Sequence, residues 1–285
     1  MRKTKRIFMA ISSMLLLSSC SSGILNNLFG KVDDDPITFS ETTIIDNDEC
    51  AITITEIDPH YIDGQSIKVD IENKTTDKKF VVYTNNEYVN GLSVNTNFYE
   101  EIGAERSRSS RITFYRSELK KYGVTKISDI ELEFYVGVSN SAETVVRETV
   151  HIYPYGEENV IRYERESSDT DNVIIDNEYA EVTVIGYKDY SWGFEVNMFL
   201  ENKSEKELLF DVGDSKVNGI TMKTTGLKYI VPGNLSYLTF GWSCFDLLKL
   251  GITDITQIEF EFEISYEVEA FVRDYIVMET FTLKP

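Results

Sequence analysis

The chain has 285 residues and carries 28 lysines and arginines against 48 aspartates and glutamates, which gives a net charge of −20. With 42% hydrophobic and 12% aromatic residues, the composition is that of a folding protein, and the length suggests about two domains. So acidic a chain is not expected to bind nucleic acid, because phosphate binding needs a basic surface. Its two histidines and three cysteines leave little material for metal or nucleophile chemistry.

The first 20 residues have the pattern of a secretory signal. A basic head is followed by an apolar run, residues 7–17, that is too short to span a bilayer. The run ends in a box that resembles the lipobox of bacterial lipoproteins, in which the cysteine is lipidated and becomes the new N-terminus. We therefore expect residues 1–19 to be a lipoprotein signal peptide and the chain to be membrane-anchored, facing outside the cytoplasm; a plain signal peptide is the alternative. The box consists of Leu17, Ser18, Ser19 and the lipidated Cys20.

The rest of the chain contains one module written twice. Six short motifs recur in the same order at offsets of 128–131 residues, which predicts a duplicated domain. Repeat 1 spans 41–155 and repeat 2 spans 172–285; a flexible tether, 20–40, precedes the first, and a charged linker, 156–171, separates the two. Recurring motifs include Ile44-Ile45-Asp46-Asn47 with Ile174-Ile175-Asp176-Asn177, Glu72-Asn73-Lys74 with Glu201-Asn202-Lys203, and Val89-Asn90-Gly91 with Val217-Asn218-Gly219.

Both repeats have the hydrophobic pattern of β-strands. Residues 130–136 and 258–264 alternate between apolar and mostly glutamate residues, which predicts strands with one buried and one wet face. Asn90-Gly91 favours a type I′ hairpin turn, because both residues tolerate positive φ. Short helices are expected at 117–122 and 245–250, each closed by a glycine. About seven short strands per repeat predict an antiparallel sandwich.

These motifs resemble immunoglobulin-like or telokin-like domains of unknown function that recur in bacterial surface lipoproteins. The resemblance covers both repeats and lies in turns and strand edges. It implies an all-β chain of two tandem antiparallel immunoglobulin-like β-sandwiches, each with one short helix. It carries no catalytic residues that could be transferred.

Cys50 and Cys244 are predicted to be free, buried thiols. An exported protein could pair them, but they occupy non-equivalent positions in the two repeats. Cys50 also keeps step with Ile52 and Ile54, which places it on the inward face of a strand.

We expect no catalysis. His60 and His151 have no counterparts in repeat 2, where Thr282 replaces His151, and no nucleophile or phosphate-loop motif is present. No metal site is predicted, but calcium at the entrances to the repeats is left open, because oxygen ligands gather there. The residues concerned are Asp46, Asp48 and Glu49 at the entrance to repeat 1, and Asp169, Asp171, Asp176 and Glu178 at or near the entrance to repeat 2.

Basic residues are concentrated in one segment of repeat 1. Seven of its 12 lysines and arginines fall between residues 106 and 126, and only one of them has a basic counterpart in repeat 2. We therefore expect a surface that docks on anionic lipid headgroups or an anionic envelope polymer, although nearby carboxylates could neutralise it. The seven residues are Arg106, Arg108, Arg111, Arg116, Lys120, Lys121 and Lys126.

Repeat 2 instead carries aromatic residues in a loop. Tyr187, Tyr190 and Trp192 suit contact with a sugar ring or a protein surface. Trp192, beside Gly193, is predicted to plug the end of the sandwich, which leaves Tyr190 as the better contact residue.

The sequence therefore favours a non-catalytic surface lipoprotein that serves as an interaction or scaffold module. Its expected partners are the membrane, through the N-terminal lipid, an anionic polymer or headgroup, and an unidentified protein or glycan. The alternatives are a solute-capturing lipoprotein that serves a transporter and, with less support, an envelope hydrolase.

Overall fold

The computed structural model describes residues 36–269 and 272–285. The predicted signal segment, with Leu17, Ser18, Ser19 and Cys20, lies outside the described residues. From Ile37 onward the chain forms one compact unit. Among the described helices, none is long and apolar enough to cross a membrane.

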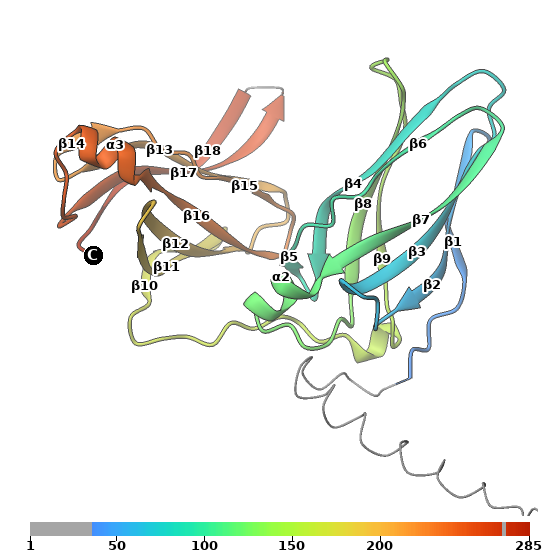
Figure 1. The fold of residues 1–285 in the computed structure, drawn as a ribbon, viewed down its shortest axis with the longest axis horizontal. Coiled ribbons are helices and arrows are strands. Elements are labelled where there is room, and N and C mark those ends of the chain that lie inside the picture. The colour runs from blue at the N-terminus through green and yellow to red at the C-terminus, as the bar shows by residue number, and fades with distance from the viewer. Residues whose placement is uncertain (1–35, 270–271) are drawn as a thin grey trace, which may run out of the picture. The chain divides into compact units, whose positions relative to one another are not determined.

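Repeat 1 consists of two antiparallel sheets that face each other (Figure 1). One sheet has the strand order β1-β2-β3-β7, and the other is built around β4 and β8. The first contains β1 (Thr42–Asp46), β2 (Cys50–Asp58), β3 (Gly64–Asn73) and β7 (Arg106–Tyr115). The second contains β4 (Phe80–Val89), β5 (Leu92–Ser93), β6 (Tyr99–Ile102), β8 (Ile130–Val138) and β9 (Thr144–Ile152).

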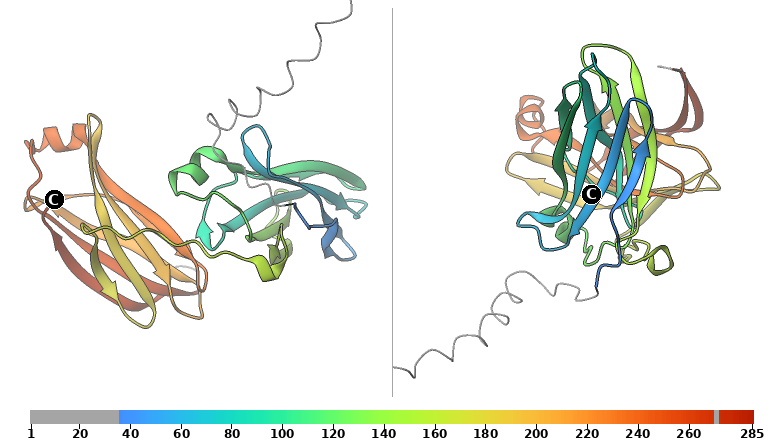
Figure 2. Two further views of the ribbon diagram at one scale, coloured as in Figure 1. Left: turned by 90° about the horizontal axis from the view of Figure 1, so that it is seen from below. Right: turned by 90° about the vertical axis from the view of Figure 1, so that its right-hand side faces the viewer.

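Repeat 2 has the same strands in the same order, and Figure 2 shows its layers from two further directions. The first sheet is β10-β11-β12-β16, and in the second β13 pairs with β14, β15 and β17. Their bounds are β10 (Asn172–Asp176), β11 (Ala180–Tyr190), β12 (Gly193–Asn202) and β16 (Leu235–Ser243), then β13 (Leu208–Val217), β14 (Ile220–Met222), β15 (Leu227–Ile230), β17 (Ile258–Glu269) and β18 (Val272–Leu283). The prediction of an all-β chain of antiparallel sheets is confirmed.

The inward faces of these strands follow the predicted alternation. Cys50, Ile52 and Ile54 are all fully buried in the core of repeat 1. Both Cys50 and Cys244 are free, as predicted, although Cys244 is only half-buried. Burial raises the pKa of the Cys50 thiol, which keeps it protonated and unreactive.

The recurring Glu-Asn-Lys motif closes each sandwich from inside. The buried Asn73 donates to the carbonyls of Lys78 and Ile102, at 2.8 and 3.2 Å, and accepts from the hydroxyl of Thr75. Asn202 makes the equivalent bonds, to Lys206, Ile230 and Ser204. One amide therefore joins the turn after a strand of the first sheet to the short strand β6 or β15.

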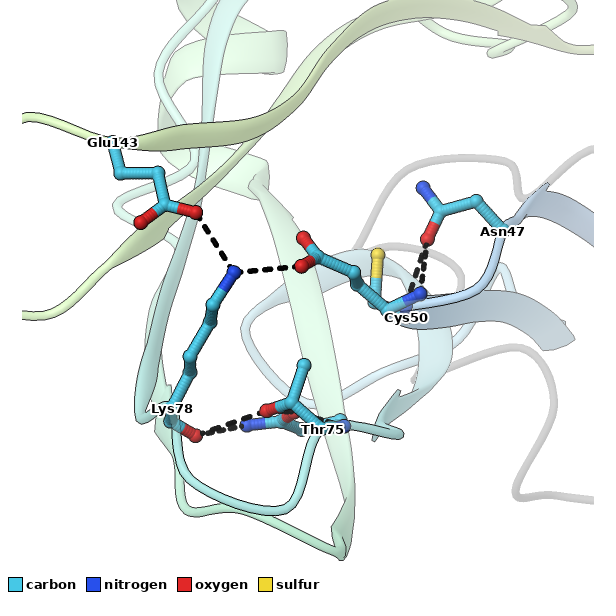
Figure 3. Close-up of polar contacts among 7 residues, drawn as sticks. Asn47, Cys50, Thr75, Lys78 and Glu143 are labelled. Carbon is cyan, nitrogen blue, oxygen red and sulfur yellow. Dashed lines mark hydrogen bonds and ion pairs between the residues drawn. The ribbon is translucent and has the colours of Figure 1, made fainter.

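A lysine bound by two carboxylates joins two turns at the same end of repeat 1 as Asn73. Lys78 lies between Glu49 and Glu143, 2.7 and 2.8 Å from their carboxylates, while Asn47 accepts from the backbone N–H of Cys50 (Figure 3). The bond to Glu143, and then that to Glu49, raises the pKa of Lys78. The lysine thus joins the β1–β2 turn to the β8–β9 turn.

The helices and hairpins match their predicted positions. α2 (Arg116–Lys121) and α3 (Cys244–Lys249) begin one residue earlier than predicted. Gly123 and Gly251 follow them with φ of 74°, a conformation that favours glycine. Asn90 and Gly91, with φ of 55° and 81°, form the predicted positive-φ turn, and Asn218 and Gly219 repeat it.

The prediction of a wet face for 130–136 is wrong. Glu131 and Glu133, both on β8, are only 9% and 8% exposed. Glu133 is covered by Arg147, at 2.7 Å, and Glu131 accepts a hydrogen bond from Asn234 of repeat 2 at 2.8 Å. The second repeat covers a position that alternation alone assigns to solvent.

Candidate functional site

One end of repeat 1 contacts the opposite end of repeat 2. We call this end of repeat 1 the helix end; it comprises Asn90-Gly91-Leu92, α2 and Tyr122. The fully buried Leu92 pairs with Leu235 in the one parallel bridge recorded between described strands, and the Leu235 N–H donates to the Gly91 carbonyl at 2.8 Å. Tyr122 stacks on Tyr237, with ring centroids 4.4 Å apart. This contact joins β5 to β16 and so extends one nine-stranded sheet through both repeats.

The predicted charged linker, residues 156–171, is hydrogen-bonded to both repeats along its middle. After a short 3₁₀ turn, η1 (Glu157–Asn159), the N–H of Ile161 donates to the Ser128 hydroxyl. The N–H of Tyr163 donates to the Asn90 carbonyl, and its hydroxyl is hydrogen-bonded to that of Tyr237 at 2.7 Å. Arg162 reaches repeat 2, where it donates to Asn234 and to the carbonyl of Gly233.

These contacts enclose a cleft of about 860 Å³, which we call the basic cleft. Its wall comes from α2 and the loop that follows, from linker residues 161–166, and from Tyr237. Five basic residues line it, namely Lys120, Lys121 and Lys126 from repeat 1 and Arg162 and Arg165 from the linker. Glu164 and Glu166 also line it, so the excess charge is positive.

Several of these cations contact neutral groups. Lys121 donates to the hydroxyl of Tyr122, at 3.2 Å, and Lys126 lies 4.1 Å from the ring centroid of Tyr155. Among the described residues, Lys120, Lys121 and Arg162 form no ion pair. Unpaired charges in a concave site attract a mobile anion more strongly than they would on a flat surface.

Among the five basic residues of the cleft, Arg165 is held by an ion pair. Its guanidinium is 2.5 Å from Asp171, and this bond lowers the pKa of the carboxyl. The guanidinium carbon also lies 5.3 Å from the ring centroid of Phe199. Its Nε is buried and has no hydrogen-bond partner among the described residues. The Asp171 contact fixes the orientation of the guanidinium group.

The tyrosines of the cleft form one connected group. Tyr237 stacks on Tyr122, is hydrogen-bonded to Tyr163, and packs edge-on against Phe199. Burial, followed by the bond to Tyr163, raises the pKa of Tyr237, so the phenol stays neutral. The group presents ring faces and hydroxyls beside the cations.

The structure places the seven predicted docking residues in two separate regions. Lys120, Lys121 and Lys126 line the basic cleft, whereas the four arginines lie along β7 and at its end. Arg108 is paired with Glu100 at 2.5 Å, and Arg111 binds Glu56 and Ser66. Arg116 donates to the carbonyl of Tyr61, and Arg106 is exposed at the far end of the strand.

Sequence reasoning missed the linker's contribution to the cleft. Arg162 and Arg165 were part of a segment interpreted only as a charged connector. Their signal was the short pattern Arg162-Tyr163-Glu164-Arg165, which places two cations around an aromatic residue in an otherwise acidic stretch.

The aromatic residues predicted in a loop of repeat 2 form a second, smaller site, but only Trp192 lies in the turn, because β11 extends through Tyr187 and Tyr190. Tyr190 stacks on Trp192, with centroids 4.3 Å apart, while Tyr187 packs on the core and against Phe194. The prediction that Trp192 plugs the sandwich is wrong, because its side chain is 62% exposed. Trp242 is the buried one, and both indoles line a groove of about 300 Å³.

Lysines contact the acidic residues at the entrances to the repeats. Lys74 contacts Asp46, and Lys203 lies 2.7 Å from Asp176 and 3.1 Å from Glu181. Within residues 36–269 and 272–285, no group of three or more acidic, histidine or cysteine side chains is arranged to hold a metal ion.

Neither histidine lines the basic cleft or the tryptophan groove. His151 Nδ1 lies 3.0 Å from Asp129, and this bond raises the pKa of the imidazole. His60 sits in an exposed turn in which its N–H donates to Asp58. Ser128, which precedes the His151 partner Asp129, is buried, and its hydroxyl donates a hydrogen bond to the Asn90 side chain.

Comparisons with known proteins give no relative for this chain. No protein-family model and no curated protein matches it. Among solved structures, the YadV chaperone aligns over 77% of this chain and 92% of its own at 10% identity, with a TM-score of 0.22. The exo-chitosanase CsxA of Amycolatopsis orientalis aligns over 81% of this chain and 26% of its own at 11% identity, with a TM-score of 0.25. At these scores neither likeness carries an argument about function.

Proposed function

We propose that this chain is a lipid-anchored bacterial envelope protein of two immunoglobulin-like sandwiches that binds an anionic polymer in the basic cleft and catalyses no reaction. The signal pattern that ends at Cys20 supports the anchor and the location. The recurring turn motifs support the immunoglobulin-like assignment. The observation that carries the binding function is the gathering of Lys120, Lys121 and Arg162 around one cleft without ion pairs among the described residues.

The basic cleft is unusual because the chain as a whole is strongly acidic. The chain as a whole carries −20, so cations that serve only solubility would be expected to pair with abundant carboxylates, as Arg108 and Arg111 do. A local positive site in an acidic molecule holds an anion that the rest of the surface repels. Such a site selects a ligand that enters it and disfavours adhesion to a broad anionic face.

The shape of the site favours a polymer chain over a bilayer. A layer of lipid headgroups is flat at this scale, whereas the five cations line a concave space with tyrosine rings in its wall. An extended chain with phosphate or carboxylate groups can enter that space and bring successive charges to the lysines and the arginines. Its linking units would contact the rings of Tyr122 and Tyr237.

The test uses the unlipidated chain, residues 21–285, with polyphosphate of defined length as the probe and polygalacturonate as its carboxylate counterpart. Binding is measured by calorimetry at low and high salt. Lys120→Glu combined with Lys121→Glu is expected to weaken binding at least about tenfold, because each cation contributes about 1 kcal/mol against an anionic target. Salt should weaken the wild-type interaction in the same direction.

The matched control uses two exposed cations outside the cleft. Lys249 occupies the position of Lys121 in repeat 2, and Arg106 lies at the far end of β7. Lys249→Glu with Arg106→Glu changes the net charge equally and should leave the affinity within about twofold. Equal weakening by both pairs would show non-specific attraction, and no binding of either polymer would refute the proposal.

Capture of a small anionic solute is a second candidate, because the cleft lies where the linker and both repeats meet. The same calorimetry with citrate and inorganic phosphate separates the two functions. A small anion that binds as tightly as the polymer, and loses affinity in the Lys120→Glu/Lys121→Glu variant, would favour solute capture.

A further inference from the structure

The helix end of repeat 1 is a docking surface that the chain itself uses. Leu92 is fully buried and is paired with Leu235 in the parallel bridge, and the Glu131 carboxylate accepts from Asn234. The N–H of Val231 donates to the hydroxyl of Tyr88 at 3.1 Å. The occupant is the turn end of repeat 2, which we define as residues 231–237; it presents an aliphatic residue two positions before an aromatic one.

Repeat 2 has the same docking surface at its own helix end. Asn218 holds the loop after α3 by accepting from the N–H groups of Thr256 and Gln257, as Asn90 holds the loop after α2. The hairpin backbones match, with φ of 51° and 80° against 55° and 81°. Three residues of repeat 1 that contact repeat 2 have counterparts at this surface. Ile220 occupies the position of Leu92, Leu250 that of Tyr122, and Glu259 that of Glu131.

This second surface is uncovered and apolar. Ile220 and Leu250 are 38% and 44% exposed, and on α3 Phe245 and Leu248 are 71% and 64% exposed. Trp192 adjoins α3, because its carbonyl accepts from the N–H of Cys244 at 2.8 Å. At the same positions repeat 1 has the polar residues Ser117, Lys120 and Asp63. A cluster of exposed large apolar side chains on one end of a domain marks a protein contact.

We propose that the helix end of repeat 2 binds the turn end of a β-sandwich in a partner protein, in the manner in which repeat 1 binds repeat 2. The partner turn presents an aliphatic and an aromatic residue two positions apart, which would pack on Ile220 and Leu250. A wild-type second copy does not fit this description. Its free turn end carries Ser107 and Ser109, at the positions of Leu235 and Tyr237, beside the charged Arg106.

The chain can be converted into its own probe. Ser107 and Ser109 are exposed on β7, so Ser107→Leu with Ser109→Tyr gives a second copy the missing pair without disturbing the core. The unlipidated chain, residues 21–285, is examined by sedimentation velocity up to roughly 100 µM, because an end-to-end contact of this size is weak. The wild type should stay monomeric, whereas the double variant should form concentration-dependent head-to-tail oligomers.

A third variant adds Leu248→Glu to the double variant and should return the chain to a monomer. Circular dichroism melts verify that all variants fold alike. A double variant that stays monomeric while folded would overturn the proposal, as would oligomers that persist after Leu248→Glu. Dimers of the wild type that Leu248→Glu abolishes would overturn it in favour of a second copy as the occupant.

Discussion

The two helix ends share a backbone and differ in their surfaces. Asn90 and Asn218 hold the same loop through the same bonds, yet Asn90 is 5% exposed and Asn218 is open to solvent. Around this common frame, α2 presents Lys120 and Lys121, and α3 presents Phe245 and Leu248. Residues that recur between the two helix ends hold the backbone, while residues that differ line the proposed binding surfaces or contact the other repeat. The comparison therefore separates structural positions from candidate functional positions within a single chain.

The largest expected effect concerns the asparagines that close the sandwiches. Asn73→Ala and Asn202→Ala should each lower the free energy of unfolding by about 3 kcal/mol, because each leaves buried carbonyl and N–H groups without partners. Urea unfolding measures the loss. Both tryptophans, Trp192 and Trp242, lie in repeat 2, so their fluorescence follows that repeat, while circular dichroism follows both.

The exposed Asn172, at the start of β10, provides the control. Asn172→Ala should change stability by less than about 0.5 kcal/mol. A loss in one asparagine variant that is less than half the loss in the other would contradict the equivalence of the two repeats.

The second prediction sharpens the contrast between the helix ends. Asn90→Ala should cost about 3 kcal/mol and Asn218→Ala about half of that, because water can satisfy the groups left unpaired at the exposed site. Both changes place alanine at positive φ, so the backbone strain is common to the pair and cancels in the comparison. Urea unfolding of the two variants gives the difference; equal losses would show that repeat 2 does not shield the helix end of repeat 1.

The smallest effect is a pH dependence confined to repeat 1. The bond to Asp129 raises the pKa of His151 above its value in the unfolded chain, so the pair stabilises repeat 1 at acidic pH. This contribution is complete below the unfolded pKa, about 6.5, and is lost as the pH rises through the folded value. Because the imidazole is 42% exposed, solvent screening limits the effect to about 0.5 kcal/mol or less.

The contribution of the His151–Asp129 pair is measured by urea unfolding of the wild type and of His151→Gln at pH 5.5 and pH 8.5. The destabilisation caused by the substitution should be larger at pH 5.5. Repeat 2, which has Thr282 opposite Glu259 where repeat 1 has His151 opposite Glu131, should show no such difference by tryptophan fluorescence. A larger destabilisation at pH 8.5 would refute the assignment.

The sequence alone predicted the all-β character, the strands at 130–136 and 258–264, both α-helices and the Asn-Gly turns. Alternating side chains, Asn-Gly pairs and helix-closing glycines act over a few residues, so their signal is local and readable. The duplication strengthened it, because each motif was seen twice. Cys50 was placed correctly on an inward face for the same reason.

Tertiary structure decided which residues meet across the repeats. Lys120 and Arg162 share a cleft only because the linker is fastened between Asn90 and Tyr237, contacts that no local pattern encodes. Glu131 is buried and accepts a hydrogen bond from repeat 2, and Trp242, not Trp192, is buried in the core of repeat 2. Burial and charge pairing depend on distant segments, and these govern where the candidate sites form.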